Sequence, residues 1–277
     1  MTHRNLFVEG LGFWAPTLPG WSSASAAFRG AATPQPSPAP IPRPSALPNA
    51  ERRRAPETLC LALAVSEAAL ESSQRLPDEV LAVFTSAHGD LPAIDHLCST
   101  LAQNPLQVSP TRFLHSIHNS PLGIWSTLAG NRKHHSAVSA ADCSFAAGVL
   151  EAALMAETEQ QPVLLVGYDT AATGALVHTT ASQGAIAVAL VLHPNASARA
   201  QWAMEWALVP SDGTASEPRS EAARSLPPNG MSQALPLLEA MALEMAVSVS
   251  MRLSPYQLLH VALSPMASRT PFAAPRR

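Results

Sequence analysis

The sequence AVSAADCSFAAGVLEAALMA at residues 137–156 predicts a short strand, a tight turn and a helix that begins immediately after the turn. The strand covers residues 137–141 and the turn residues 142–144, and small side chains surround both. Small side chains allow close packing of backbone or of an extended ligand. We expect the helix to bury four apolar side chains: Phe145, Val149, Leu150 and Leu154.

Cys143 lies where this helix begins. Unpaired N–H groups and the positive end of the helix dipole favour the thiolate there, and the thiolate is the nucleophilic form of cysteine. A buried junction with an inert cysteine explains the same residues. The stretch by itself leaves both interpretations open.

Composition excludes several classes of protein. The chain has 277 residues, of which 47% are hydrophobic and 13% charged, and its net charge is −3. We therefore expect neither nucleic acid nor an anionic membrane as a partner. Three cysteines without metal-ligand spacing indicate a reducing compartment, the cytoplasm, and no metal. The N-terminus lacks the apolar core of a signal peptide, and residues 185–192, the longest apolar run, are too short to span a bilayer.

Strands and helices alternate along the chain, which indicates an α/β fold. Strands are predicted at residues 5–14, 80–86, 137–141, 162–167, 184–192, 203–209 and 258–263. Helices are predicted at residues 56–73, 91–101, 119–130 and 231–245, besides the helix after Cys143. Residues 109–118 are expected to be irregular. Residues 162–167 and 184–192 are apolar throughout, as in strands that helices cover on both faces.

Two segments are expected to be loops within a single domain that covers residues 1–277. Residues 31–49 are so rich in proline that neither a helix nor a central strand fits them. Too little sequence precedes them to form a core of its own, so we place this loop inside the domain. Residues 211–230 are polar and contain proline, which predicts a mobile loop.

The order of motifs is that of a known family. The opening strand carries LFVEGLG at residues 6–12, and RRR at residues 52–54 precedes the first long helix. SP at residues 109–110 leads to Asn119 and a helix that stops at Gly130, and SAADCS follows at residues 139–144. From residue 5 to about residue 209 the chain resembles the N-terminal half of the β-ketoacyl synthases. The resemblance implies a thiolase-like mixed sheet flanked by helices, with Cys143 at the position of the synthase nucleophile.

The departures from the synthase pattern imply a protein that is not catalytic alone. A working synthase takes two histidines from its C-terminal half, which we expect to be missing here, and HGD at residues 88–90 comes too early to supply one. Asp142 replaces a small residue beside the thiol, and a neighbouring carboxylate opposes ionisation of a thiol. Phe145 also replaces a small residue and could block the acyl entrance.

A shortened chain of this kind is most similar to the short chain length factors of bacterial aryl polyene pathways, a branch of fatty-acid- and polyketide-like biosynthesis. The resemblance implies a cytoplasmic heterodimer with a full-length ketosynthase, whose acyl cavity this chain would shape. It also implies transient contact with an acyl carrier protein, whose phosphopantetheine thioesters are the substrates of the complex, and no bound cofactor.

The same resemblance implies two groups of interface residues. The segment that contains Phe113, Ile117, Asn119 and Leu122 would reach toward the partner's acyl channel, and a strand with Ala137, Val138 and Ser139 would lie at the subunit interface. Bulk in the channel would set where a growing chain stops. Ordinary core packing, or an internal strand, explains these residues equally well.

Two other functions stay open. Cys143 could serve a stand-alone acyltransferase or thioesterase, with His115 or His118 as its base. Alternatively, the chain could be a scaffold homodimer without acyl chemistry.

Overall fold

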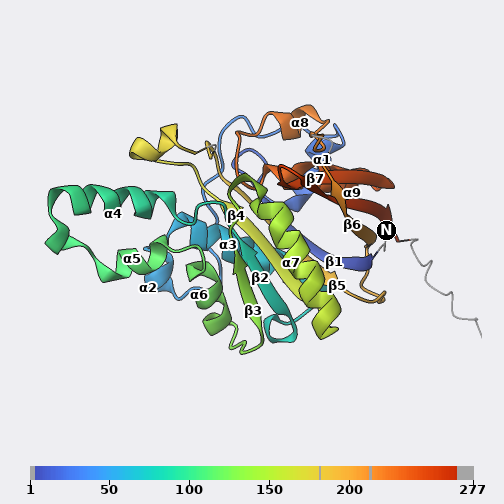
Figure 1. The fold of residues 1–277 in the computed structure, drawn as a ribbon, viewed down its shortest axis with the longest axis horizontal. Helices are drawn as coiled ribbons and strands as arrows, with labels where there is room; N and C mark the ends of the chain where they lie inside the picture. Colours follow the sequence, from blue (N-terminus) through green and yellow to red (C-terminus); the bar gives the residue numbers. More distant parts are fainter. Residues whose placement is uncertain (1–3, 181, 212–213, 267–277) are drawn as a thin grey trace, which may run out of the picture.

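Eight strands form one continuous mixed sheet in the computed structural model, which describes residues 4–180, 182–211 and 214–266 (Figure 1). The strands are β1 (Arg4–Trp14), β2 (Leu81–Thr85), β3 (His135–Val138), β4 (Val163–Asp169), β5 (Ile186–His193), β6 (Trp202–Pro210), β7 (Val247–Ser254) and β8 (Gln257–Pro265). Their order is β3-β2-β4-β5-β1-β6-β8-β7. β2 pairs in parallel with β3 and β4, and all other pairs are antiparallel.

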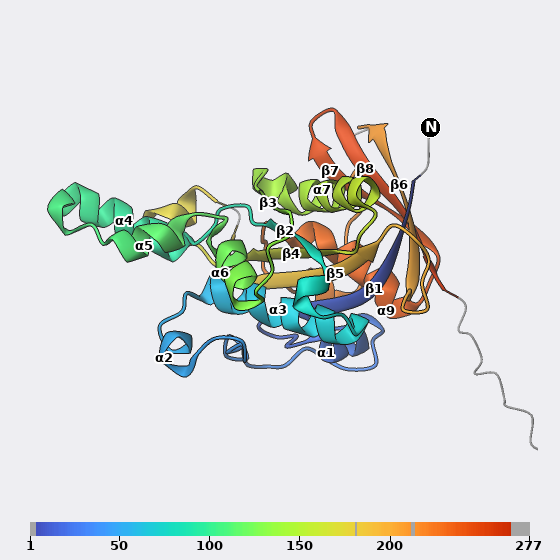
Figure 2. The ribbon, with the colours of Figure 1, turned by 90° about the horizontal axis from the view of Figure 1, so that it is seen from below.

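Helices cover both faces of the sheet, as the α/β prediction requires. They are α1 (Trp21–Phe28), α2 (Asn49–Arg52), α3 (Glu57–Ser73), α4 (Leu91–Gln103), α5 (Pro110–Ser116), α6 (Ser120–Leu128), α7 (Ser144–Glu159), α8 (Glu221–Arg224) and α9 (Leu235–Leu243). α7 lies on one side of the central strands and α3 on the other (Figure 2). α9 and α1 contribute to the core on the α7 side, and α6 to the core on the α3 side.

The central strands are apolar throughout because each of their faces belongs to a different core. In β5, Ile186, Val188 and Leu190 belong to the core under α7. Ala187 and Ala189, between them, belong to the core under α3. Side chains of a strand alternate between the two faces of a sheet, so a strand covered on both faces cannot carry polar residues at every second position.

α3 packs directly onto the backbone of β1. A side-chain carbon at Gly10 would overlap the carbonyl oxygen of Ala69, and one at Gly12 that of Val65. The pairing of β1 with β5 shifts between Val8 and Gly10, so this bulge sets which face the second half of β1 presents to α3. The glycines of the opening strand are therefore required by the close approach of the helix.

The structure corrects four predictions of secondary structure. The strand predicted at residues 137–141 ends at Val138. The segment predicted to be irregular at residues 109–118 contains α5, which Ser109 caps by accepting a hydrogen bond from the Arg112 amide. Neither α1 nor β7 was predicted. Leu154 is 39% exposed and Leu150 is half-buried, whereas Phe145 and Val149 are fully buried as predicted.

The two predicted loops differ in content. Residues 31–48 contain no helix or strand, and α2 begins at residue 49. The segment 211–230 contains α8, whose Ala222 and Ala223 are buried. Residues 212 and 213 of that segment lie outside the described residues.

Replacing Gly12 tests the contact between β1 and α3. We expect Gly12→Ala to lower the free energy of unfolding by about 1–3 kcal/mol, because the new methyl group meets helix backbone that cannot rotate away. Gly123→Ala in α6 is the matched control, since no atom lies within 4 Å of a side-chain carbon there. Urea denaturation measures both, and equal stability of the two variants would contradict the proposed contact.

Candidate functional site

A strained turn carries Cys143 to the start of α7. Ala141 has a φ of 47°, a left-handed conformation that costs an alanine free energy. Ser144 holds the turn closed, because its Oγ accepts a hydrogen bond from the Ala140 amide at 2.8 Å and donates one to the Ala141 carbonyl at 2.7 Å. We call residues 139–144 the elbow. It places Cys143 at the N-cap position of α7, where the sequence predicted it.

The elbow is tied to the sheet beneath it. The hydroxyl of Thr85, at the end of β2, donates to the carbonyl of Ser144 at 2.7 Å. Phe145 is fully buried in the core under α7. Gly148 and Gly167 leave no space for a side chain next to Thr85 and Met231, respectively. The start of α7 is therefore closely packed on the face that meets the sheet, whereas Asp142 is exposed and Cys143 half-buried.

The surroundings of Cys143 disfavour its thiolate. Burial raises the pKa of the thiol, and the carboxylate of Asp142 raises it further, whereas the guanidinium of Arg252 on β7 lowers it. The raising effects outweigh the lowering one. Asp142 and Arg252 are the charged side chains that contribute to this pKa shift, and neither His115 nor His118 contributes to it.

A buried carboxylate lies at the ends of β2 and β4, beneath the elbow. Asp169 is 1% exposed and accepts hydrogen bonds from the Ser86 hydroxyl at 2.6 Å and the Ala87 amide at 3.1 Å. Burial raises its pKa to about 6, although these hydrogen bonds work in the opposite direction. The Ala87 carbonyl in turn accepts a hydrogen bond from Ser139 at 3.2 Å. Asp169 thus holds the chain segment on which the elbow rests.

His88 interacts electrostatically with Asp142 of the elbow. Burial lowers its pKa, and the negative charge of Asp142 only partly offsets this. Its Nε2 is buried without a hydrogen-bond partner among the described residues. The sequence pointed to this histidine only as part of a turn, because no spacing rule relates His88 or Arg252 to Cys143.

β3 forms one open edge of the sheet. Among the described strands it pairs only with β2, and all four of its residues are half-buried. The predicted interface residues Ala137 and Val138 lie on this strand, and the exposed Ser139 follows it. His135, on the same strand, is half-buried and stacks edge-on against Trp125 at 5.7 Å. An edge of this kind is suited to be covered by another chain.

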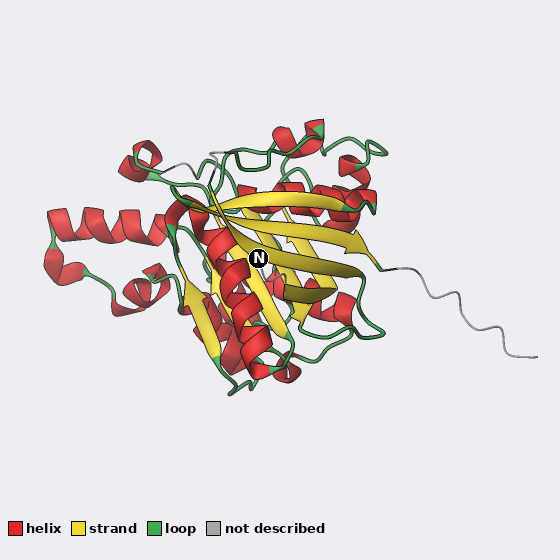
Figure 3. Cartoon of the chain, turned by 45° about the vertical axis from the view of Figure 1, so that its right-hand side comes forward, coloured by secondary structure: helices red, strands yellow, loops and turns green. Residues whose placement is uncertain are grey.

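α4 and α5 form an arm that extends away from the sheet at its β3 end (Figures 1 and 3). Several large apolar side chains of the arm are exposed: Leu101, Leu106, Phe113, Leu114 and Ile117. Leu106 is 95% exposed and Phe113 57% exposed. Asn119, at the N-cap of α6, is also exposed, but Leu122 is buried in the core under α3. Of the four residues predicted to reach a partner, three are therefore exposed, and Leu122 is instead a core residue.

The described part of the chain shows neither a cluster of potential metal ligands nor a helix long and apolar enough to cross a membrane.

Raising the pH tests the burial of Asp169. A carboxyl group whose pKa is raised on folding stabilises the folded state at low pH, and this contribution falls as the pH rises from about 4 to about 6. We expect Asp169→Asn to remove that part of the pH dependence, on the order of 2–3 kcal/mol.

Urea denaturation between pH 4 and 7 measures the difference between the native protein and Asp169→Asn. Asp78→Asn, on the exposed surface, is the matched control. A difference that stays constant over this pH range would show that Asp169 titrates normally.

Comparisons with known proteins agree on one family. The family model for the N-terminal domain of β-ketoacyl synthases matches residues 21–254. No curated protein matches the sequence significantly.

Solved structures share the fold at low sequence identity. A chain in the complex of the ketosynthase ApeO with its chain length factor ApeC from Xenorhabdus doucetiae is 22% identical, with a TM-score of 0.71. The match covers 93% of this chain and 99% of that one. The ishigamide ketosynthase/chain length factor is 13% identical with a TM-score of 0.66, covering 95% of this chain and 100% of that one.

A third structure contains a carrier protein. It is the type II polyketide synthase complex AntDE:AntF, an acyl carrier protein with its ketosynthase bound to the hexaketide. The identity is 12% and the TM-score 0.74, and the match covers 96% of this chain and 100% of that one.

Proposed function

The chain belongs to the β-ketoacyl synthase N-terminal domain family, and from this premise we propose that it is a chain length factor. In this role it binds a full-length β-ketoacyl synthase as a heterodimer and shapes the cavity that holds the growing acyl chain. The partner carries out the condensation. The similarity to complexes of a ketosynthase with its chain length factor supports this assignment.

The environment of Cys143 is the observation that carries the proposal. The elbow keeps the geometry of a nucleophile position, yet burial and Asp142 raise the pKa of the thiol. Nucleophilic catalysis by cysteine needs the thiolate, together with a base that removes the proton. Neither His115 nor His118 contributes to the pKa shift of this thiol. The chain therefore keeps the position of the family nucleophile without the means to activate it.

The exposed surfaces at one end of the sheet support a partner. β3 is an open edge, and the adjoining arm exposes apolar side chains that water solvates poorly. A full-length ketosynthase that covers both would bury these side chains and satisfy the free edge. Phe113 and Ile117, exposed on the same side of the chain, would then face the partner.

In this role the arm sets the length of the product. A side chain that projects into an acyl cavity makes further extension costly, since overpacking a closed space costs about 1–3 kcal/mol. We assign the complex to aryl polyene synthesis in the cytoplasm, with phosphopantetheine thioesters of an acyl carrier protein as substrates and no resident cofactor.

Shortening the arm side chains tests the proposed role in chain length. The complex with the ketosynthase from the same gene cluster is purified and supplied with acyl and malonyl carrier-protein thioesters, and mass spectrometry measures the products. We expect Phe113→Ala with Ile117→Ala to shift the main product upward by at least one extension unit, because space opens in the cavity wall. Phe113→Trp should shorten it.

Two controls separate this role from catalysis. Tyr256→Ala removes an aromatic side chain that is 82% exposed at the opposite end of the sheet, and it should leave the product unchanged. Cys143→Ala should retain turnover. Loss of turnover in Cys143→Ala, or an unchanged product in all the arm variants, would contradict the proposal.

A further inference from the structure

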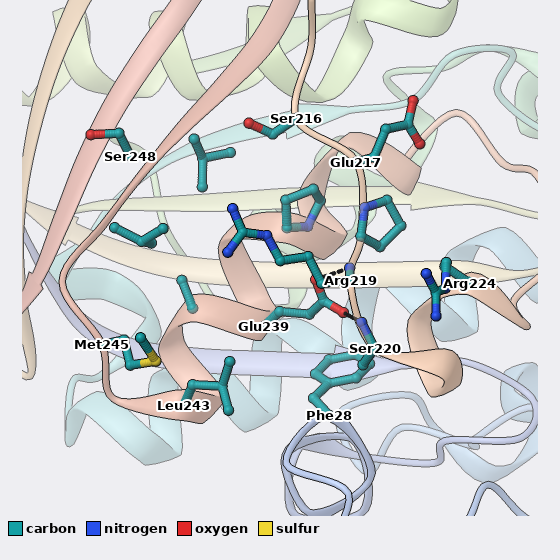
Figure 4. Close-up of a pocket in the computed structure, with 15 residues that line it drawn as sticks. Phe28, Ser216, Glu217, Arg219, Ser220, Arg224, Glu239, Leu243, Met245 and Ser248 are labelled. Atoms are coloured by element: carbon teal, nitrogen blue, oxygen red, sulfur yellow. Dashed lines mark hydrogen bonds between the residues drawn. The ribbon is translucent and has the colours of Figure 1, made fainter.

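A groove lies beside β7, at the opposite end of the strand order from β3. It encloses about 630 Å³ and opens to solvent. Its walls come from α1, the segment before α8, α9 and the beginning of β7 (Figure 4). We call it the β7 groove, and its defining residues are Phe28, Arg219, Arg224, Leu243, Met245 and Ser248.

The edge of β7 that borders the groove has unpaired backbone groups. Within the described part of the chain, β7 pairs only with β8. The Ser216 amide donates to the Ser250 carbonyl at 2.8 Å, and the Ser250 amide donates to the Ser216 hydroxyl at 2.9 Å, so the backbone groups of Ser250 point away from β8. In an antiparallel pair, residues two apart point to the same side. The N–H and C=O of Ser248 therefore also point outward, and they have no partner among the described residues.

The floor of the β7 groove exposes apolar side chains. Leu243, at the end of α9, is 44% exposed, and Met245, which follows α9, is 55% exposed. Val247 and Phe28 continue the apolar lining toward β7 and α1. Side chains of this kind, gathered in a groove next to a free strand edge, are typical of surfaces that bind an extended segment.

Two arginines and two glutamates line the β7 groove. Arg219 reaches across it toward β7, and Arg224 lies on the far side, beyond Ser220 (Figure 4). Neither guanidinium has a hydrogen-bond or ion-pair partner among the described residues. Glu217 is the one exposed carboxylate in the described lining.

The buried Glu239 binds the backbone of the segment before α8. It is 5% exposed, and its carboxylate accepts hydrogen bonds from the backbone amides of Arg219 at 2.8 Å and Ser220 at 2.6 Å. The carboxylate is thus engaged by backbone. The segment that carries Arg219 is held in place, which reduces the conformational entropy that binding would otherwise cost.

We propose that the β7 groove binds an extended acidic peptide segment of a partner protein, which adds a strand to the β7 edge. Its backbone pairs with Ser248, an apolar side chain rests on Leu243 and Met245, and carboxylates meet Arg219 and Arg224. The free N–H and C=O of Ser248 favour a peptide over a compact small molecule, because an added strand forms hydrogen bonds with both groups. This surface is separate from β3 and the arm, so the inference does not depend on the proposed function.

The test measures binding of labelled hexapeptides to the full chain, alone and in its complex with a ketosynthase, by fluorescence anisotropy. One set alternates glutamate with valine or leucine, and the matched set has lysine at each glutamate position. We expect the acidic set to bind at least tenfold more tightly. Arg219→Gln with Arg224→Gln should remove that difference, whereas Arg112→Gln, on the arm, should leave it intact.

Methylation of the peptide backbone tests strand addition without altering the protein. N-methyl groups on every second amide should abolish binding in one register and be tolerated in the shifted register. Equal binding of the two peptide sets, or indifference to methylation, would overturn the proposal. Displacement of all peptides by decanoate, with no effect of methylation, would also overturn the proposal, because it would indicate an amphipathic carboxylate as the ligand. Self-association that is lost in the double arginine variant would assign the groove to a second copy of this chain.

Discussion

The conformation of the elbow is the constraint on which the surrounding structure depends. Ala141 takes a left-handed conformation only because Ser144 bridges both sides of the turn and Thr85 anchors the start of α7 to β2. Strain of this kind persists where neighbouring contacts determine the backbone, and in enzymes it is found at functional positions. Here it presents Cys143 at a helix N-terminus, above a core that Phe145 and two close-packed glycines fill.

The surroundings of Cys143 do not favour its thiolate. A helix N-terminus favours a thiolate, but burial and Asp142 raise the pKa of Cys143 despite the opposing influence of Arg252. Burial keeps the nearby His88 largely uncharged, so it does not supply a positive charge to the site. An elbow whose thiol has a raised pKa fits the proposal of a subunit whose contribution lies in its surfaces. Those surfaces are the open edge of β3 and the apolar arm, which adjoin at one end of the sheet.

The sequence was sufficient for the parts of the fold that follow from periodicity. The apolar runs of β4 and β5, the Gly10–Gly12 pattern of β1 and the turn before α7 were all recognisable. α5 was not predicted, although the capping residue Ser109 and the following proline are a helix-start signal. The alternation of VSVSMRLS, residues 247–254, is likewise a strand signal. Arg252 and Asp169 could not be linked to Cys143, because β7 and β4 meet the elbow only through the tertiary fold.

The proposed function requires that this chain forms a heterodimer with a full-length ketosynthase. Size-exclusion chromatography with light scattering, on the chain co-expressed with the full-length ketosynthase of its gene cluster, tests it most directly. The account predicts a one-to-one complex whose mass exceeds that of the ketosynthase subunit by 29.1 kDa. A ketosynthase that elutes as a homodimer, next to this chain as a separate stable species, would contradict it.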